Sequence, residues 1–190
     1  MTTTEPTLIP LPALAPAQHK AQLWADDSQQ VFAVVMGDRV PDLSARLAEA
    51  DVIDHDCLLP GALEPDLQRR APYLVHLKRE SAFTDWLLFE ASAGLGPWGV
   101  LVCSPAKRLF LRSHLRGLLQ ARIPGGQQIA LDWMDPQILQ ILLPLFDAAA
   151  LSAFMGPVQS YVIAGTDHWF TASLNLGQLQ SRSVPLAKAA

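Results

Sequence analysis

Residues 94–105 read GLGPWGVLVCSP, and this stretch decides the fold that the sequence predicts. Its glycines and Pro97 end any helix before them, because glycine and proline are the least favourable residues inside a helix. GVLVC is then a short apolar run between turn formers, which is typical of a strand buried inside a sheet. Ser104 and Pro105 follow in the order of a helix cap and a first helical residue. The stretch therefore predicts a helix, a central strand and a second helix in succession.

Apolar runs on both sides of this stretch extend the same pattern. VFAVVMG, YLVHL and VQSYVIA are predicted strands, at residues 31–37, 73–77 and 158–164. Helices are predicted to begin near Pro41, Ser81, Ser104, Asp135 and Asp147. Strands that alternate with helices predict an α/β fold, so we expect a single compact domain with a mixed, partly parallel sheet flanked by helices.

Composition predicts how the chain is divided. The prolines spaced through the first residues predict an extended, flexible leader over residues 1–17. We expect the folded domain to cover residues 18–172, followed by a weakly patterned tail over residues 173–190. With 190 residues, of which 50% are hydrophobic, the chain can bury a core without metal or disulfide cross-links.

Charge and hydropathy exclude several classes of protein. The formal net charge of -4 and a pI of about 5.6 provide no basic surface for nucleic acid. Glycine and proline interrupt the longest uncharged stretches, residues 91–106 and 148–166, so neither predicts a membrane span. The N-terminus lacks the basic and apolar regions of a secretory signal. We therefore expect a cytoplasmic protein that binds no nucleic acid and does not insert into membranes.

No motif predicts a cofactor, a metal site or a catalytic group. The glycines of residues 94–99 spell G-x-G-x-x-G, but they follow a helix and precede a strand, the reverse of the order in a dinucleotide site. The run DHDC at residues 54–57 contains possible metal ligands, yet neighbouring side chains on an extended chain point to opposite sides. A small hydrolase or transferase that uses Asp135 and His168 stays open as an alternative.

Three arginines form the most regular polar feature of the sequence. Arg108, Arg112 and Arg116 recur every four residues, so they share one face of the predicted helix. This face could be solvated, could form an internal network with carboxylates such as Asp132 and Asp135, or could dock an acidic partner. We take the three arginines as the candidate partner-binding site.

Other residues are expected to form turns, caps and packing contacts. Trp98 and Gly99 should hold the entry to the central strand, with the indole buried. The remaining structural candidates are two pairs that begin or end helices: Asp135 with Pro136, and Gly156 with Pro157.

Six segments, in order, resemble the adaptor or chaperone domain of bacterial type VI secretion, a family long catalogued as a domain of unknown function. They are VFAVVMGD (31–38), APYLVHL (71–77), GLGPWGVLVCSP (94–105), LRSHLRGLL (111–119), MDPQIL (134–139) and FMGPV (154–158). The chain departs from the family pattern at Asp132 and Gln137, where arginines are common, whereas Arg116 matches a basic position of the family.

The resemblance implies a cytoplasmic protein that is not an enzyme. Members recognise the N-terminal region of a toxic effector, stabilise it and help to load it onto the spike protein (VgrG). The expected partners are therefore a cognate secreted effector and the spike. An immunity-like or regulatory module that binds the toxin is the alternative within the class of binding proteins.

Overall fold

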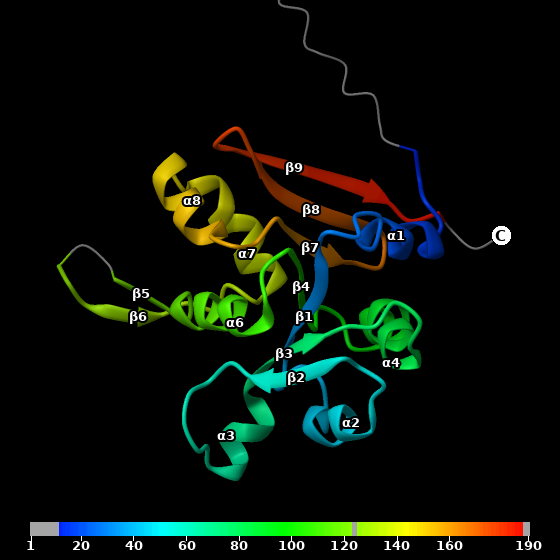
Figure 1. Ribbon diagram of the computed structural model, residues 1–190, viewed down its shortest axis with the longest axis horizontal. Helices are drawn as coiled ribbons and strands as arrows, with labels where there is room; N and C mark the ends of the chain where they lie inside the picture. The colour runs from blue at the N-terminus through cyan, green and yellow to red at the C-terminus, as the bar shows by residue number, and fades with distance from the viewer. Residues whose placement is uncertain (1–11, 123–124, 188–190) are drawn as a thin grey trace, which may run out of the picture.

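The computed structural model describes residues 12–122 and 125–187, and its centre is a seven-stranded sheet of order β2-β3-β1-β4-β7-β8-β9 (Figure 1). A separate two-stranded ribbon, β5 with β6, projects from the body of the protein. The strands are β1 (Gln30–Met36), β2 (Asp54–Cys57), β3 (Pro72–His76), β4 (Gly99–Ser104), β5 (Gln120–Arg122), β6 (Gln128–Ala130), β7 (Ser160–Ala164), β8 (His168–Asn175) and β9 (Gln178–Pro185).

Helices cover the two faces of this sheet. On one face lie α1 (Pro16–Leu23), α2 (Leu43–Glu49), and α4 (Ala82–Asp85), which continues as a π-helical segment (Trp86–Ala91) into α5 (Ser92–Gly94). On the other face lie α6 (Arg108–Gly117), α7 (Pro136–Leu142) with a 3-10 turn (Leu143–Leu145), and α8 (Ala148–Met155). The short α3 (Pro65–Arg70) precedes β3 and buries none of its residues. No helix within the described residues is long and apolar enough to cross a membrane.

The central strands are apolar along their whole length because both of their faces are packed. Val31, Ala33 and Val35 of β1 enter the core under α2 and α4, whereas Phe32 and Val34 enter the core under α6 and α8. Every residue of β4 is buried. Side chains alternate across a strand, so a continuous apolar run supplies two cores at once.

The expectation of a partly parallel sheet is wrong, because all the strand ladders among the described residues are antiparallel. The helix-connected strands β3 and β4 do run in the same direction. However, β1 lies between them and pairs with both in the opposite direction. In the same way β3 separates β1 from β2. A helix between two strands permits either relative direction, since β2 and β3 are joined through α3 and are antiparallel, and it does not decide which strands become neighbours.

Most of the described residues expected as a C-terminal tail belong to the sheet, and residues 188–190 lie outside the described residues. The predicted domain boundary after residue 172 falls inside β8, and residues 178–185 form β9, the strand at one edge. Leu176 and Gly177 join the two strands with positive φ angles of 50° and 78°, as the two-residue turn of a tight hairpin requires. The short N-X-G signal at residues 175–177 is the local feature that marks this turn.

The predicted leader also contributes to the fold. Pro16 begins α1, and Leu14 forms an isolated parallel bridge with Leu186 next to the end of β9. The rest of the predicted leader, residues 1–11, lies outside the described residues.

Trp98 and Gly99 have the structural roles that the sequence predicts. The Trp98 side chain is buried, and its indole Nε1 donates a hydrogen bond to Ser92 Oγ at 2.8 Å. Gly99 lies opposite Val35 in the ladder that joins β4 to β1. A Cβ atom at Gly99 would lie 2.0 Å from the carbonyl oxygen of Val34, so only glycine permits the two strands to approach this closely.

We predict that Gly99→Ala lowers the free energy of unfolding by about 3 kcal/mol, because the added methyl group meets the β1 backbone, which cannot move aside. Gly94→Ala is the matched control, since a Cβ atom there would enter open space and alanine favours a helix over glycine. Urea unfolding of both variants measures the difference, and equal midpoints would contradict the packing of β4 on β1.

Candidate functional site

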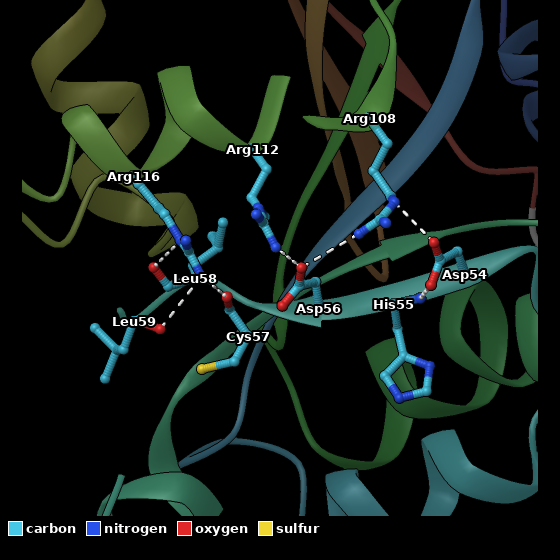
Figure 2. A network of polar contacts seen from close by, with 9 residues as sticks. All are labelled: Asp54, His55, Asp56, Cys57, Leu58, Leu59, Arg108, Arg112 and Arg116. Carbon is cyan, nitrogen blue, oxygen red and sulfur yellow. Dashed lines mark hydrogen bonds and ion pairs between the residues drawn. The ribbon is translucent and has the colours of Figure 1, made fainter. Parts of the chain in front are cut away.

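The three arginines of α6 point toward the edge strand β2 (Figure 2). Arg108 Nε lies 2.8 Å from Asp54 Oδ2, and Arg108 Nη1 donates to Asp56 Oδ2 at 3.2 Å. Arg112 forms an ion pair with the same carboxylate of Asp56. All four side chains are partly exposed, so water weakens these ion pairs.

Arg116 contacts main-chain atoms at the end of the same strand. Its Nε donates to the carbonyl of Leu58 at 2.9 Å, and its Nη2 donates to the carbonyls of Cys57 at 2.8 Å and Leu59 at 3.4 Å. A planar guanidinium with donors in a fixed fork suits such a set of acceptors. Arg116 therefore fastens α6 to the segment that leaves β2.

The arginine stripe, Arg108 with Arg112 and Arg116, thus has intramolecular partners in the structure. Of the possibilities that the sequence left open, an internal network matches this geometry, but its carboxylates are Asp54 and Asp56 in place of the pair suggested at residues 132 and 135. The two aspartates are two residues apart on a strand, so they face the same side, toward α6. Figure 2 shows that the residue between them, His55, points to the other side of β2. Docking of a partner on the stripe stays a prediction.

The run of residues 54–57 does not gather its side chains around one point. Among the described residues, no group of three or more histidine, cysteine, aspartate or glutamate side chains has an arrangement that could hold a metal ion. Burial raises the pKa of the Cys57 thiol, which favours its neutral form.

Asp135 and Pro136 begin α7 as predicted. The Asp135 side chain accepts hydrogen bonds from the backbone N–H groups of Gln137 and Ile138, and Arg39 Nη2 lies 3.4 Å from its other oxygen. This carboxylate is therefore occupied as a helix cap. His168 lies at the start of β8, on a different element, where it pairs with Pro185.

Gly156 and Pro157 end α8 next to the long helix. Gly156 has a φ of 49°, and a Cβ atom there would collide with the imidazole of His114, which contacts the carbonyl of Phe154 at 2.9 Å. The Pro157 carbonyl accepts a hydrogen bond from Ser104 Oγ at 2.7 Å, so Ser104 joins β4 to this turn.

A concave surface lies elsewhere on the described part of the chain, on strands β7, β8 and β9. A groove of about 690 Å³ opens there between the sheet and α1. On this side of the sheet, α2 and α4 pack over the strands up to β4, and α1 covers only one end of the remaining strands. The rest of the sheet face is open, and its side chains form the floor of the groove.

The groove is lined mainly by neutral hydrogen-bonding side chains. Serine and threonine hydroxyl groups form much of the floor, at Ser160, Thr171 and Ser173. Four glutamines stand around it: Gln22, Gln29, Gln159 and Gln180. Each glutamine offers both a donor and an acceptor, as a peptide group does. The lining therefore matches a polypeptide main chain better than an apolar ligand.

One of these glutamines has an unused acceptor. The Gln29 Oε1 atom is buried and has no hydrogen-bond partner among the described residues. Buried polar atoms are nearly always paired, and this acceptor reaches a partner in the groove only when the Gln29 side chain turns outward.

Two titratable residues of the lining are held neutral. Burial lowers the pKa of His19, with Arg182 acting in the same direction, and His19 Nε2 lies 3.3 Å from the Pro185 carbonyl. Burial also raises the pKa of the Cys103 thiol to about 11. At neutral pH, Arg182 is consequently the charged side chain of the lining.

Sequence reasoning missed this groove because it predicted a tail over residues 173–190. Its local signal is the alternation in residues 168–175 and 178–185, since one face of each strand is mostly polar or small. The site also needs α1, β7 and the hairpin side by side, and these elements meet only in the folded chain.

We predict that Arg116→Ala lowers the free energy of unfolding by about 1 to 2 kcal/mol, because three main-chain carbonyls lose their donor. Arg116→Lys, which retains the charge but not the fork of donors, should recover only part of this loss. Thermal or urea unfolding measures the stability of both variants. An alanine variant as stable as the unmodified protein would show that the fastening of α6 is not energetically important.

We predict that stability falls with decreasing pH and that His19 contributes to this fall. The folded pKa of His19 lies below its ordinary value of 6.5, so the unfolded chain binds a proton first as the pH drops. Its contribution is present above about 6.5 and is lost as the pH falls through the folded pKa. Urea unfolding of His19→Gln between about pH 7 and pH 5 should show a shallower decline than the unmodified protein.

If the free energy of unfolding falls with pH at the same slope in His19→Gln and in the unmodified protein, His19 does not titrate differently in the folded and unfolded chains. The other histidines are present in both proteins, so their effects cancel in this comparison.

Comparison with known proteins gives a match to one family. Neither a curated protein nor a solved structure matches the chain. The family model described as "Domain of unknown function (DUF4123)" matches residues 31–153, which run from β1 into α8 and include the arginine stripe. Most of the groove, formed by α1 and β7 to β9, lies outside the matched segment. Because the match covers more than half of the 190 residues, the chain belongs to the DUF4123 family.

Proposed function

We propose that this protein is an adaptor of bacterial type VI secretion that works in the cytoplasm without catalysing a reaction. It binds the N-terminal region of a toxic effector in the groove over β7, β8 and β9, and it helps to load that effector onto the spike protein. The family membership and the order of the six sequence segments support this function. The observation that carries it is the groove itself.

The groove has the size and the chemistry of a peptide-binding site. About 690 Å³ is within the usual range of ligand pockets and is large enough for several residues of an extended chain. Hydroxyl and amide groups provide hydrogen bonds in many directions, which suits a main chain whose donors and acceptors alternate. An effector segment that binds here loses contact with water and with other proteins, and this protects it before secretion.

The floor of the groove is a rigid surface. Val162 and Trp169 are buried in the core that α1 and the π-helical segment cover. On the other face of the same strands, Tyr161 and Ala172 are buried against α8 and its neighbours. A floor that is packed from behind loses little conformational entropy when it binds a partner.

The arginine stripe has a supporting role in this proposal. Its guanidinium groups hold α6 on β2, at the opposite edge of the sheet from the groove. An acidic patch of a second partner could still reach the partly exposed faces of Arg108 and Arg112, whose side chains are 27% and 26% exposed.

We predict that Ser173→Trp weakens effector binding at least about tenfold, because a large side chain on the floor fills the groove. Ser152→Trp is the matched control, since Ser152 is exposed on α8, in the helix layer on the other face of the sheet. Calorimetry with the toxin encoded next to this protein measures the affinity, and the amount of soluble and secreted toxin measures the function in cells.

The expected result is that the unmodified protein and Ser152→Trp bind the toxin and support its secretion, and that Ser173→Trp does neither. Absence of binding by the unmodified protein would refute the adaptor function. Protection of cells from the toxin without any effect on secretion would assign the protein to the immunity class instead.

A further inference from the structure

The edge strand β9 presents main-chain groups that no described residue uses. Leu186 N–H donates to the Asp167 carbonyl, so residue 186 faces β8. N–H and C=O groups of successive strand residues point to alternate sides. The groups of Ser183, Ser181 and Leu179 therefore point away from β8, toward the outside of the sheet.

The end of this edge already pairs with one residue of the chain through an isolated bridge. Leu14 N–H donates to the Pro185 carbonyl at 2.9 Å, and Ala187 N–H donates to the Leu14 carbonyl at 2.8 Å. This bridge is parallel and involves the outward-facing groups of the chain. It shows that the outward main-chain groups at this end of β9 can be reached by another main chain.

The groove and the edge form one continuous surface. Gln180 and Arg182 extend from β9 into the groove, next to Ser173 and Thr171 of β8. Leu179 also lines the groove, although its side chain packs in the core on the other face of the sheet. Its contribution to the groove is therefore its main chain, and the groove reaches the unpaired edge.

The charges along this surface differ from one side to the other. Arg182 is close to His19 and α1, and it makes no ion pair with any described residue. Asp26 lies near Gln159, the lining residue that precedes β7. A partner segment with a carboxylate next to Arg182 and no acidic group near Asp26 fits this arrangement.

We infer that an extended segment of the effector binds as an additional strand on the outer edge of β9, with alternate side chains in the groove and a carboxylate on Arg182. This inference rests on the proposed function and specifies how the effector is bound. Main-chain hydrogen bonds to residues 179–183 supply affinity that depends little on sequence. Arg182 and the glutamines of the groove supply the selection among segments.

The edge can be blocked without disturbing the hairpin. Proline at Ser181 removes an N–H that points outward, so the ladder to β8 keeps its hydrogen bonds. Ser181→Ala is the matched control, since it removes the same hydroxyl but keeps the N–H. Calorimetry measures the affinities of both variants for the toxin encoded next to this protein. The same measurement is made with overlapping peptides of the N-terminal region of that toxin.

We expect Ser181→Pro to weaken binding at least about tenfold and Ser181→Ala to bind as the unmodified protein does. Thermal unfolding of the free proteins verifies that the proline variant is folded. Arg182→Gln, which leaves the edge intact, should weaken binding by about tenfold at low salt and by less at high salt.

Amide hydrogen exchange of the unmodified protein gives an independent readout that needs no variant. In the complex, the amides of Leu179, Ser181 and Ser183 should become protected from exchange. Those of Gln180 and Arg182 face β8 and should be protected in the free protein as well.

The outcomes separate this inference from the proposed function. If the unmodified protein binds the toxin, but Ser181→Pro binds equally well and the outward amides stay unprotected, the strand addition is wrong and the adaptor function stands. If the unmodified protein does not bind the toxin, the adaptor function itself fails. A dimer of the free protein that Ser181→Pro dissociates would identify a second copy as the occupant, and would also overturn the inference.

Discussion

The close contact between β1 and β4 is the constraint on which the rest of the structure depends. Gly99 brings β4 so near to the carbonyl of Val34 that no side chain fits between the strands. These two strands carry apolar residues of both cores, so their separation sets the positions of the helix layers. The other strands add to this pair, with β3 on one side and β7 on the other.

The two edges of the sheet are treated differently, and the proposed binding surface lies at the less protected edge. At one edge, β2 is short, acidic and covered by the arginines of α6, which protects it from pairing with other chains. At the other edge, β9 is twice as long and has outward main-chain groups that no described residue uses beyond the bridge to Leu14. In the proposed mode of binding, association is therefore directed to the β9 edge.

The groove beside β9 exists because one helix layer is incomplete. Over β1 and β3, the residues that face α2 and α4 are apolar, as at Ala33 and Val75. Over β8 and β9, the same face carries Thr171, Ser173 and Gln180. The change from apolar to polar side chains along one face of one sheet marks where the helices stop and where the proposed partner would bind.

The sequence by itself determined the central elements, because apolar runs and caps are local signals: β1, β3, β4 and β7, the cap of α7 at Asp135, and the buried Trp98. It also determined that three arginines share a face of α6. Only the tertiary structure decided strand order and direction, and it paired two of those arginines with Asp54 and Asp56, which are over fifty residues away. It also decided that residues 178–185, expected to belong to a tail, become β9. Pairing between distant segments depends on which surfaces remain to be buried once the chain has collapsed, and no local pattern encodes that.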